Sequence, residues 1–384
     1  DRLQAWSDSL EAANPGKYYK ENKQNPVFKG YHADPEVLYS NKTGKFYIYP
    51  TTDGQLGWKS HDFHVFSSPD MKTWKDEGVM FDLQKDCSWA DWYAWAPCAI
   101  EVKWNKKTGT VITEKENKAF DKAVAKKNNK KYDYRYFYYF VANKQIGVAF
   151  SDTPEGPFTD ALGKPLLDKN PKGEGGQVID PDVFQDPVSG KYYLYWGNGC
   201  CYWAKLNEDM VSLGSEITPL DVKDPAVTGP EYTEGPWLYK HDKNYYLIYA
   251  TKFPECIDYS MTGNLKKGKW EYKGTLMPTE HGSNTNHPGV VDYKGHTYFF
   301  YHDDGLPGGH GYCRSVCVEE MFFNPDGTIQ QLHMTEGIKE GLGTLNPYKR
   351  VEAETIAFSV GVHSSLTKET GICITDIHPG DYIK

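Results

Sequence analysis

The chain has 384 residues, enough for a sizeable core and for one large domain or two to three ordinary ones. Acidic residues outnumber basic ones by 52 to 43, and the net charge of -9 argues against a nucleic-acid partner, which would need a basic face. No apolar run reaches the roughly 18 residues of a membrane span. With 29 Tyr, 11 Trp, 36 Gly and 23 Pro, the composition favours a loop-rich β protein over a helical bundle.

Residues 1–24 are predicted to form an N-terminal extension that packs on the following domain or closes it. From residue 25 a three-part unit repeats five times. The first part of each unit is a polar residue, a proline within two residues of it and an apolar run. The second part is a turn followed by an aromatic strand. The third part is a strand that ends in a Ser, Asp or Gly turn. The units open with ADPEVLY (33–39), WAPCAIEV (95–102), IDPDVFQD (179–186), TEGPWLYK (233–240) and NHPGVVDY (286–293).

Five such units predict an all-β fold with a five-bladed β-propeller over 25–332. The alternative is a β-sandwich in which the turns coincide by chance. The second unit carries a Lys- and Asn-rich insertion at 104–131, in which 116–127 has the apolar spacing of a short helix. We expect this insertion to be a solvated surface excursion rather than a site for an acidic polysaccharide.

Beyond residue 332 the repeat stops. Residues 333–349 are predicted to be a linker, and a new β segment begins at 350–384. The predicted architecture is therefore a five-bladed propeller with a C-terminal extension.

The first strand of each propeller blade lines the central axis, so the residues that open the five units should meet at one mouth. These residues are Asp34, the 95–97 stretch, Asp180, Glu234 and His287. Clustered carboxyl groups repel one another when ionised, a situation that proteins tolerate mostly where chemistry needs an acid and a base.

Two carboxyl groups facing each other across a sugar are the equipment of a glycosidase. One protonates the leaving oxygen, and the other activates water or attacks directly. A third can hold the acid in position and tune its pKa. Asp182 would share a strand face with Asp180 and is a rival for that third role.

Taken together, these motifs resemble those of glycoside hydrolase family 43. NPVFKGYHADP (25–35) resembles the family's opening motif and implies that Asp34 is the general base. IDPDVFQD (179–186) implies that Asp180 modulates the pKa of the acid, and YTEGPWLYK (232–240) implies that Glu234 is the general acid.

Two later motifs extend the resemblance, which covers about residues 25–330. NTNHPGVV (284–291) implies that His287 lies beneath the substrate or helps bind an axial metal ion. YCRSVCVEEM (312–321) implies that Arg314 contacts the sugar or holds Asp180. The resemblance also implies an inverting mechanism, with base and acid roughly 6.5–9.5 Å apart to leave room for a water.

The segment 350–384, with VEAE and TDIHPGDYIK, resembles the start of a family 6 carbohydrate-binding module. Such a module is a β-sandwich, and the segment is too short for a complete one, so we expect a truncated module. The alternative is a short extra strand pair docked on the propeller.

We therefore predict an inverting exo-acting glycoside hydrolase that removes terminal sugars, α-L-arabinofuranose foremost, from plant-type polysaccharides. β-D-Xylosidase, endo-arabinanase, and galactofuranosidase or galactanase activity are the alternatives within the family. A non-catalytic sugar-binding propeller is disfavoured because a lectin has no use for a proton donor opposite a base. A protein-interaction propeller is disfavoured as well, because it needs no axial carboxylates. The candidate walls of the sugar pocket are Trp58, Trp89, Trp92 and Trp95.

No organic cofactor is required. A calcium ion near the propeller axis is compatible with His287 as one ligand and waters as most others, but the chemistry does not need it. The expected partner is an oligosaccharide or polysaccharide, with no nucleic acid and no membrane span, and we expect a monomer. A polysaccharide substrate predicts a periplasmic or secreted protein. The sequence begins at Asp1 with no signal peptide, and a chain with a processed N-terminus would look the same.

Overall fold

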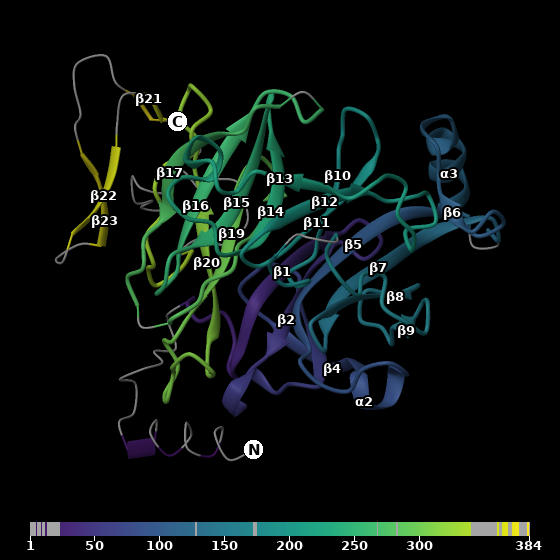
Figure 1. The fold of residues 1–384 in the computed structure, drawn as a ribbon, viewed down its shortest axis with the longest axis horizontal. Helices are drawn as coiled ribbons and strands as arrows, with labels where there is room; N and C mark the ends of the chain where they lie inside the picture. Colours follow the sequence, from purple (N-terminus) through teal and green to yellow (C-terminus); the bar gives the residue numbers. More distant parts are fainter. Residues whose placement is uncertain are drawn as a thin grey trace.

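The computed structural model describes residues 24–126, 129–171, 175–266, 268–281 and 283–338, together with residues 5, 9, 12 and 13 and four short strands between 359 and 383. Five antiparallel sheets follow one another along the chain and stand around a central axis (Figure 1). The predicted five-bladed β-propeller is confirmed.

The strands of each blade run in chain order, apart from the inserted strand β6. Blade 1 contains β1 (His32–Ser40), β2 (Lys45–Thr52), β3 (Asp62–Ser68) and β4 (Lys75–Asp82). Blade 2 contains β5 (Trp95–Asn105), β6 (Thr110–Val111), β7 (Tyr132–Ala142), β8 (Gln145–Ser151) and β9 (Thr159–Asp160). Blade 3 contains β10 (Asp182–Gln185), β11 (Tyr192–Trp196), β12 (Cys201–Lys205) and β13 (Thr218–Leu220).

Blade 4 contains β14 (Glu234–His241), β15 (Asn244–Thr251), β16 (Cys256–Thr262) and β17 (Glu271–Met277). Blade 5 contains β18 (Gly289–Tyr293), β19 (His296–Asp303) and β20 (Ser315–Met321). The short helices are η1 (Leu56–Trp58), α2 (Leu83–Asp86), η2 (Glu114–Glu116), α3 (Asn117–Val124) and α4 (Pro225–Thr228).

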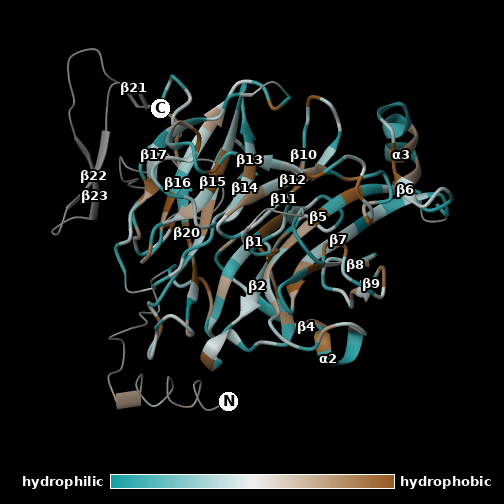
Figure 2. Cartoon of the chain, viewed as in Figure 1, coloured by the Kyte–Doolittle hydropathy of each residue, from teal (hydrophilic) through white to brown (hydrophobic). Residues whose placement is uncertain are grey.

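Apolar clusters between neighbouring blades hold the ring together. One cluster lies in each of the five contacts between adjacent blades, including the contact between blades 1 and 5. There, Phe46 and Ile48 of blade 1 pack with Phe300 and Val318 of blade 5. Figure 2 shows the hydrophobic positions along the strands and the hydrophilic ones in many of the connecting loops. The aromatic second strands predicted from the sequence therefore form the core.

The start of the described propeller closes the ring at blade 5. The Val27 N–H donates to Val316 O of β20 at 2.8 Å, and the Val318 N–H donates to Asn25 Oδ1 at 2.8 Å. The Gln24 N–H donates to Glu336 O at 2.9 Å, so the segment that follows blade 5 meets the same corner. Residues 24–27 thus lie along the free edge of β20.

The helix predicted in the insertion of blade 2 is confirmed as α3. Its Phe120 is buried and packs against Tyr132 and Tyr134 at the start of β7. Thr113 and Glu116 form a capping box at the start of η2. The insertion therefore stands at the rim of blade 2, away from the axis (Figure 1).

The predicted extension at 1–24 and the predicted module at 350–384 lie largely outside the described residues. In the latter segment, β21 (Ser359–Val360) pairs with β24 (Tyr382–Ile383), and β22 (His363–Thr367) pairs with β23 (Gly371–Thr375). No helix among the described residues is long and apolar enough to cross a membrane.

Candidate active site

The first strands of the blades begin with a shared backbone irregularity. Asp34, Ala96, Asp180 and Gly235 have positive φ values of 49°, 31°, 58° and 63°, and each precedes a proline. In blades 1, 2 and 4, the pairing of the first strand with the second slips at this point. Such a bulge re-aims the side chains at a sheet edge, and a positive φ is unfavourable for residues other than Gly. The predicted catalytic residues Asp34 and Asp180 therefore both stand at strained backbone positions.

The register corrects one detail of the sequence interpretation. Glu234 pairs with Ala250, as Ala33 pairs with Thr51, so the blade-4 residue that corresponds to Asp34 is Gly235 and not Glu234. A Cβ atom on Gly235 would lie 3.0 Å from His287 Nδ1, and its φ is positive, so a glycine fits best here. Glu234 thus stands one position before the bulge.

Asp34 is buried among groups that stabilise its ionised form. Thr51 Oγ1 donates to Asp34 Oδ2 at 2.7 Å, and Arg314 Nη1 donates to Asp34 Oδ1 at 3.2 Å. Burial alone would raise the pKa of Asp34, but Arg314, His302, His287 and the Thr51 hydroxyl outweigh it and lower this pKa to about 2. Asp34 is therefore a carboxylate over the whole ordinary pH range.

Arg314 is held by Asp53 as well as by Asp34. Its Nε and Nη2 donate to Asp53 Oδ2 and Oδ1 at 2.7 and 2.9 Å, a bidentate ion pair inside the protein. The resemblance implied that Arg314 contacts the sugar or holds Asp180. Its hydrogen bonds to carboxylates go to Asp34 and Asp53. Arg314 still acts on Asp180 electrostatically, because its charge works to lower the pKa of that carboxyl.

Asp180 and Glu234 show the opposite tendency. Burial, followed by the charges of Glu234 and Asp34, raises the pKa of Asp180 well above its usual range. Burial also raises the pKa of Glu234, and Asp34 adds to this, although Asn198 Nδ2 donates to Glu234 Oε2. The Gly235 N–H donates to Asp180 Oδ2 at 3.0 Å, which fixes Asp180 beside Glu234. The three predicted carboxyl groups thus share one electrostatic centre in which one is ionised and two favour the protonated form.

Asp182 occupies a different place. Its Oδ2 accepts the Leu238 N–H at 2.7 Å, and burial raises its pKa to about 7. Of the two rivals, Asp180 is the one whose pKa responds to Glu234 and Asp34.

Sequence reasoning missed several polar groups at this centre. His302 Nδ1 accepts the Asp34 N–H at 3.0 Å, which makes it an unprotonated nitrogen. Glu255, which precedes β16, is buried, and burial followed by the charge of Glu234 raises its pKa well above its usual range. His302 is the next-to-last residue of β19, whereas Glu255, Asp53 and Asn198 follow the second strands of their blades. Each lies beside the start of a first strand because neighbouring strands are antiparallel.

His287 is buried, and burial lowers its pKa, so its imidazole is neutral. Calcium prefers several oxygen ligands. Among the described residues, no three His, Cys, Asp or Glu side chains gather as a metal-binding group. One imidazole is a poor match for calcium, and we derive no step through a metal.

The four tryptophans predicted to form walls of the sugar pocket lie in three different places. Trp95 Nε1 donates to Trp58 O at 2.7 Å, and Trp58 Nε1 donates to Gly311 O at 2.9 Å, so these two lie together next to the Arg314 loop. Trp92 is 39% exposed and packs edge-on against His61. Trp89 donates to Asp160 and stacks on Phe140, which places it in the packing of blade 2 rather than in a pocket wall.

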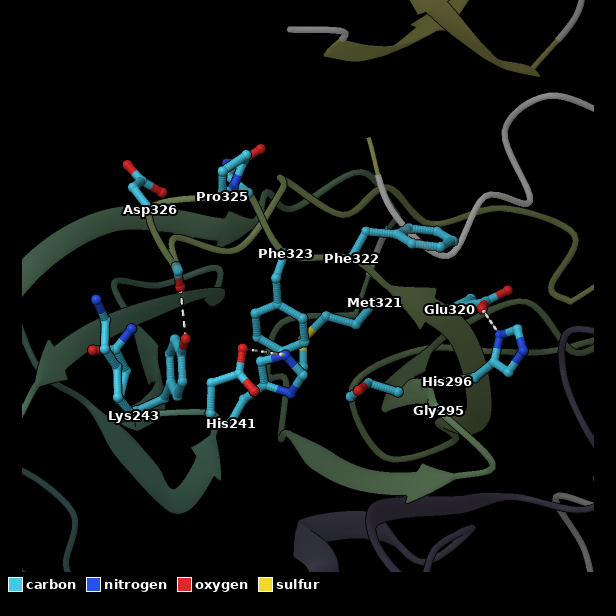
Figure 3. Close-up of a pocket in the computed structure, with 16 residues that line it drawn as sticks. His241, Lys243, Gly295, His296, Glu320, Met321, Phe322, Phe323, Pro325 and Asp326 are labelled. Atoms are coloured by element: carbon cyan, nitrogen blue, oxygen red, sulfur yellow. Dashed lines mark hydrogen bonds and ion pairs between the residues drawn. The ribbon is translucent and has the colours of Figure 1, made fainter. Parts of the chain in front are cut away.

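A cavity of about 410 Å³ lies at the opposite end of blades 4 and 5 (Figure 3). It includes His241, the last residue of β14, whereas Glu234 is the first, so roughly 23 Å of strand separates the two. Its wall residues are engaged with one another: His241 stacks on Phe323 with ring centroids 3.8 Å apart, and His296 Nδ1 lies 2.5 Å from Glu320 Oε1. This cavity is separate from the carboxyl centre.

The model of the glycosyl hydrolases family 43 matches residues 23–329. The chain belongs to this family. The prediction of a glycoside hydrolase on a β-propeller is thus confirmed at the level of the family.

Relatives carry several related activities. An arabinoxylan arabinofuranohydrolase of Paenibacillus polymyxa is 29% identical over 98% of this chain, which spans 62% of that protein's length. A β-D-galactofuranosidase, xynD, of Aspergillus niger is 30% identical over 82% of this chain and 86% of that protein. Among solved structures, one similar protein is a family 43 β-xylosidase/α-arabinofuranosidase from a compost microbial metagenome, in complex with xylotriose and free of calcium. The TM-score is 0.64 and the sequence identity is 27%. The similarity covers 82% of this chain and 98% of that one.

Proposed function

We propose that the protein is an inverting exo-acting glycoside hydrolase that removes terminal sugars, α-L-arabinofuranose foremost, from plant-type polysaccharides. The observation that carries this proposal is the opposite pKa shift of two carboxyl groups in one buried centre. The pKa of Asp34 falls to about 2, whereas that of Glu234 rises. A base that is always ionised and an acid that keeps its proton are what inverting hydrolysis requires.

In this mechanism Asp34 takes a proton from a water molecule as that water attacks the anomeric carbon. Glu234 gives its proton to the leaving oxygen as the glycosidic bond breaks. Asp180, which the Gly235 N–H fixes beside Glu234, is the candidate modulator of the acid. Burial and the charge of Asp34 favour the protonated form of Glu234. Arg314 keeps Asp34 ionised, and His287 and the Trp58–Trp95 pair are the candidate sugar contacts.

The choice of sugar rests on the relatives. The Paenibacillus enzyme is named for arabinofuranose release, and the similarity to it extends over almost the whole chain. β-D-Xylosidase activity is the second candidate, because the compost structure is named for both xylosidase and arabinofuranosidase activities. The galactofuranosidase name of the Aspergillus relative keeps that sugar as a further alternative.

The test is release of nitrophenol from aryl α-L-arabinofuranoside and aryl β-D-xyloside, with the Asp34→Asn protein as blank. Turnover of the arabinoside alone supports the proposal. Turnover of the xyloside alone transfers the specificity to the second candidate and keeps the mechanism. If neither aryl glycoside is hydrolysed but oligomers are released from arabinan, the result contradicts exo action and favours an endo-arabinanase.

We further propose that 350–384 begins a family 6 carbohydrate-binding module. The match to the Paenibacillus relative over 98% of the chain supports a shared segment beyond the propeller. A polysaccharide substrate is too large to enter cells freely, which supports a periplasmic or secreted site of action, and we expect a monomer. Sedimentation of the purified chain and fractionation of the source cells test these two points.

A further inference from the structure

His302 binds the main chain of Asp34, the proposed base, and the sequence motifs assign it no role. We propose that His302 is a positioning residue whose neutral imidazole accepts the Asp34 N–H and so fixes the strained main chain from which the base projects. The contact crosses from blade 5 to blade 1. This inference rests on the proposed role of Asp34 as the base.

The main chain of Asp34 needs an acceptor from outside its own blade. The register of β1 against β2 slips between Ala33 and Glu36, so Asp34 lies in the gap of the ladder. Its φ of 49° is unfavourable for a residue other than glycine, and such a conformation persists only where neighbouring groups hold it. Asp34 is also 8% exposed, so an N–H without an acceptor would be costly here. His302 Nδ1 supplies the acceptor at 3.0 Å.

The tautomer of His302 follows from its two partners. Nδ1 accepts an N–H and therefore carries no hydrogen. Nε2 lies 2.9 Å from Thr285 O, and because a carbonyl oxygen can only accept, Nε2 carries the hydrogen and donates it. The side chain of His302 is 0% exposed. The imidazole is thus neutral, and its two nitrogens link blade 1 to the loop that opens blade 5.

The same device occurs elsewhere in the ring. Ala96 has a φ of 31°, and its N–H donates to Thr51 Oγ1 of blade 1 at 2.7 Å. Thr51 and His302 hold corresponding places, because each is the next-to-last residue of the second strand of its blade. Gly235 has a φ of 63°, and its N–H donates to Asp180 Oδ2 of blade 3 at 3.0 Å. In each of these three contacts, a side chain of one blade holds the strained residue of the next.

Of the three residues held in this way, Asp34 alone carries a carboxylate. Thr51 Oγ1 and Arg314 Nη1 bind that carboxylate at 2.7 and 3.2 Å, whereas His302 holds the main chain behind it. Loss of the His302 acceptor would let the main chain turn and carry the carboxylate with it. Because a displacement of about 1 Å at a reacting group can cost on the order of 10²-fold in rate, this loss should appear in turnover.

Two variants separate the two nitrogens of His302. In His302→Asn, the amide oxygen takes the place of Nδ1 and can accept the Asp34 N–H. In His302→Gln, the amide lies one carbon further out, so its NH₂ group takes the place of Nε2 and the Asp34 N–H loses its acceptor. On aryl glycosides we expect kcat of His302→Asn to stay within about fivefold of wild type and that of His302→Gln to fall by about 10–100-fold, with KM within about twofold for both.

A double variant shows whether the effect passes through the base. If His302 acts by placing Asp34, His302→Gln should cost less than about threefold in kcat in the Asp34→Asn background, because the base that it places is already gone. A merely structural role would reduce kcat by the same factor in both backgrounds. A dinitrophenyl glycoside keeps the residual rates measurable, because its leaving group needs little assistance.

The matched control is His296→Gln. His296 is the first residue of the same strand, β19, and its Nδ1 lies 2.5 Å from Glu320 Oε1, at the end of the blade away from Asp34. This variant should leave kcat and KM unchanged, and thermal unfolding of each variant reports any loss of folding. Wild-type kcat in a folded His302→Gln, or an equal loss in both backgrounds, would overturn the inference.

A measurement on the wild-type protein keeps the inference testable if His302→Gln does not fold. With ¹⁵N-labelled histidine, the signals of His302 are those that disappear in His302→Asn. They should report a neutral ring with its hydrogen on Nε2. A hydrogen on Nδ1, in either the neutral or the charged ring, would contradict the bond to Asp34.

Asp34→Asn separates this inference from the proposed function. If that variant alone keeps wild-type turnover, the assignment of the base is wrong. If it loses turnover while a folded His302→Gln matches wild type, only the inference about His302 fails.

Discussion

Arg314 Nη1 lies 3.2 Å from Asp34 Oδ1, although the two residues are 280 positions apart in the chain. This contact joins the first blade to the last at the centre of the ring. It also supplies the positive charge that keeps a buried carboxylate ionised, because burial alone would favour the protonated form. The same pair therefore bridges the first and last blades and sets the charge state of the proposed base.

Removing the charge of Arg314 should change the pH dependence of catalysis. In Arg314→Met, burial acts on Asp34 with less opposition, so its pKa should rise from about 2 by about 1–3 units, and the acid limb of kcat/KM should move upward with it. Arg314→Lys keeps the charge and should show a smaller shift. Both are checked by pH profiles on an aryl glycoside; identical acid limbs in wild type and Arg314→Met would rule out this role.

Asp34→Asn should lower kcat by about 10²–10⁴-fold while the protein stays folded, because the variant loses the base but keeps the shape of the side chain. Its Oδ1 can still accept from Thr51 Oγ1. Initial rates on a natural oligosaccharide and circular dichroism check the two parts. Wild-type turnover by a folded variant would assign the base to another residue.

Glu234→Gln should show a dependence on the leaving group. Without the acidic proton, hydrolysis of a poor leaving group should fall by about 10²–10⁴-fold, whereas a dinitrophenyl glycoside should react at a rate close to that of wild type. Parallel kinetics on the two substrates measure this. Equal losses on both would indicate a binding role for Glu234 rather than proton donation.

Asp182 should make stability depend on pH. Burial raises its pKa from 3.8 to about 7 in the folded protein, so the folded state holds a proton that the unfolded chain releases near pH 3.8. Its contribution to stability is therefore present below about pH 3.8 and is lost as pH rises to about 7, by an amount on the order of 4 kcal/mol.

Asp182→Asn removes this titration, and its amide oxygen can still accept the Leu238 N–H. Urea unfolding should show a smaller decline in the free energy of unfolding between pH 4 and 7.5 than in wild type. Asp242→Asn is the control, because the Asp242 side chain is 85% exposed. Parallel curves for wild type and Asp182→Asn would contradict the assignment.

The repeated motifs were sufficient to predict the propeller and its three axial carboxyl groups. Each motif marks the start of a first strand, and the position of those starts in a propeller is fixed by the architecture. The motifs could not predict that Glu234 stands one position before the residue that corresponds to Asp34. A bulge changes the register by one residue, and a short motif does not reveal on which side of the bulge a side chain stands.

The residues that surround the carboxyl groups were harder to find, for a physical reason. Asp53, Asn198, Glu255 and His302 stand at or just after the ends of second strands, where they resemble ordinary turn residues. The available signal was the antiparallel pairing itself, because the end of a second strand lies beside the start of the first. The partner of Arg314 depends on side-chain reach, which strand order does not encode.

The seam between residues 24–27 and β20 also governs when the molecule can be completed during synthesis. Asn25 leaves the ribosome early, and its partner Val318 follows 293 residues later. At about 5–20 residues per second, that delay is roughly 15–60 s. Throughout this interval the face of blade 1 that carries Phe46 and Ile48 has no blade 5 to cover it. The nascent chain thus carries an open apolar edge until its last blade emerges, and this edge is where we expect a chaperone to bind.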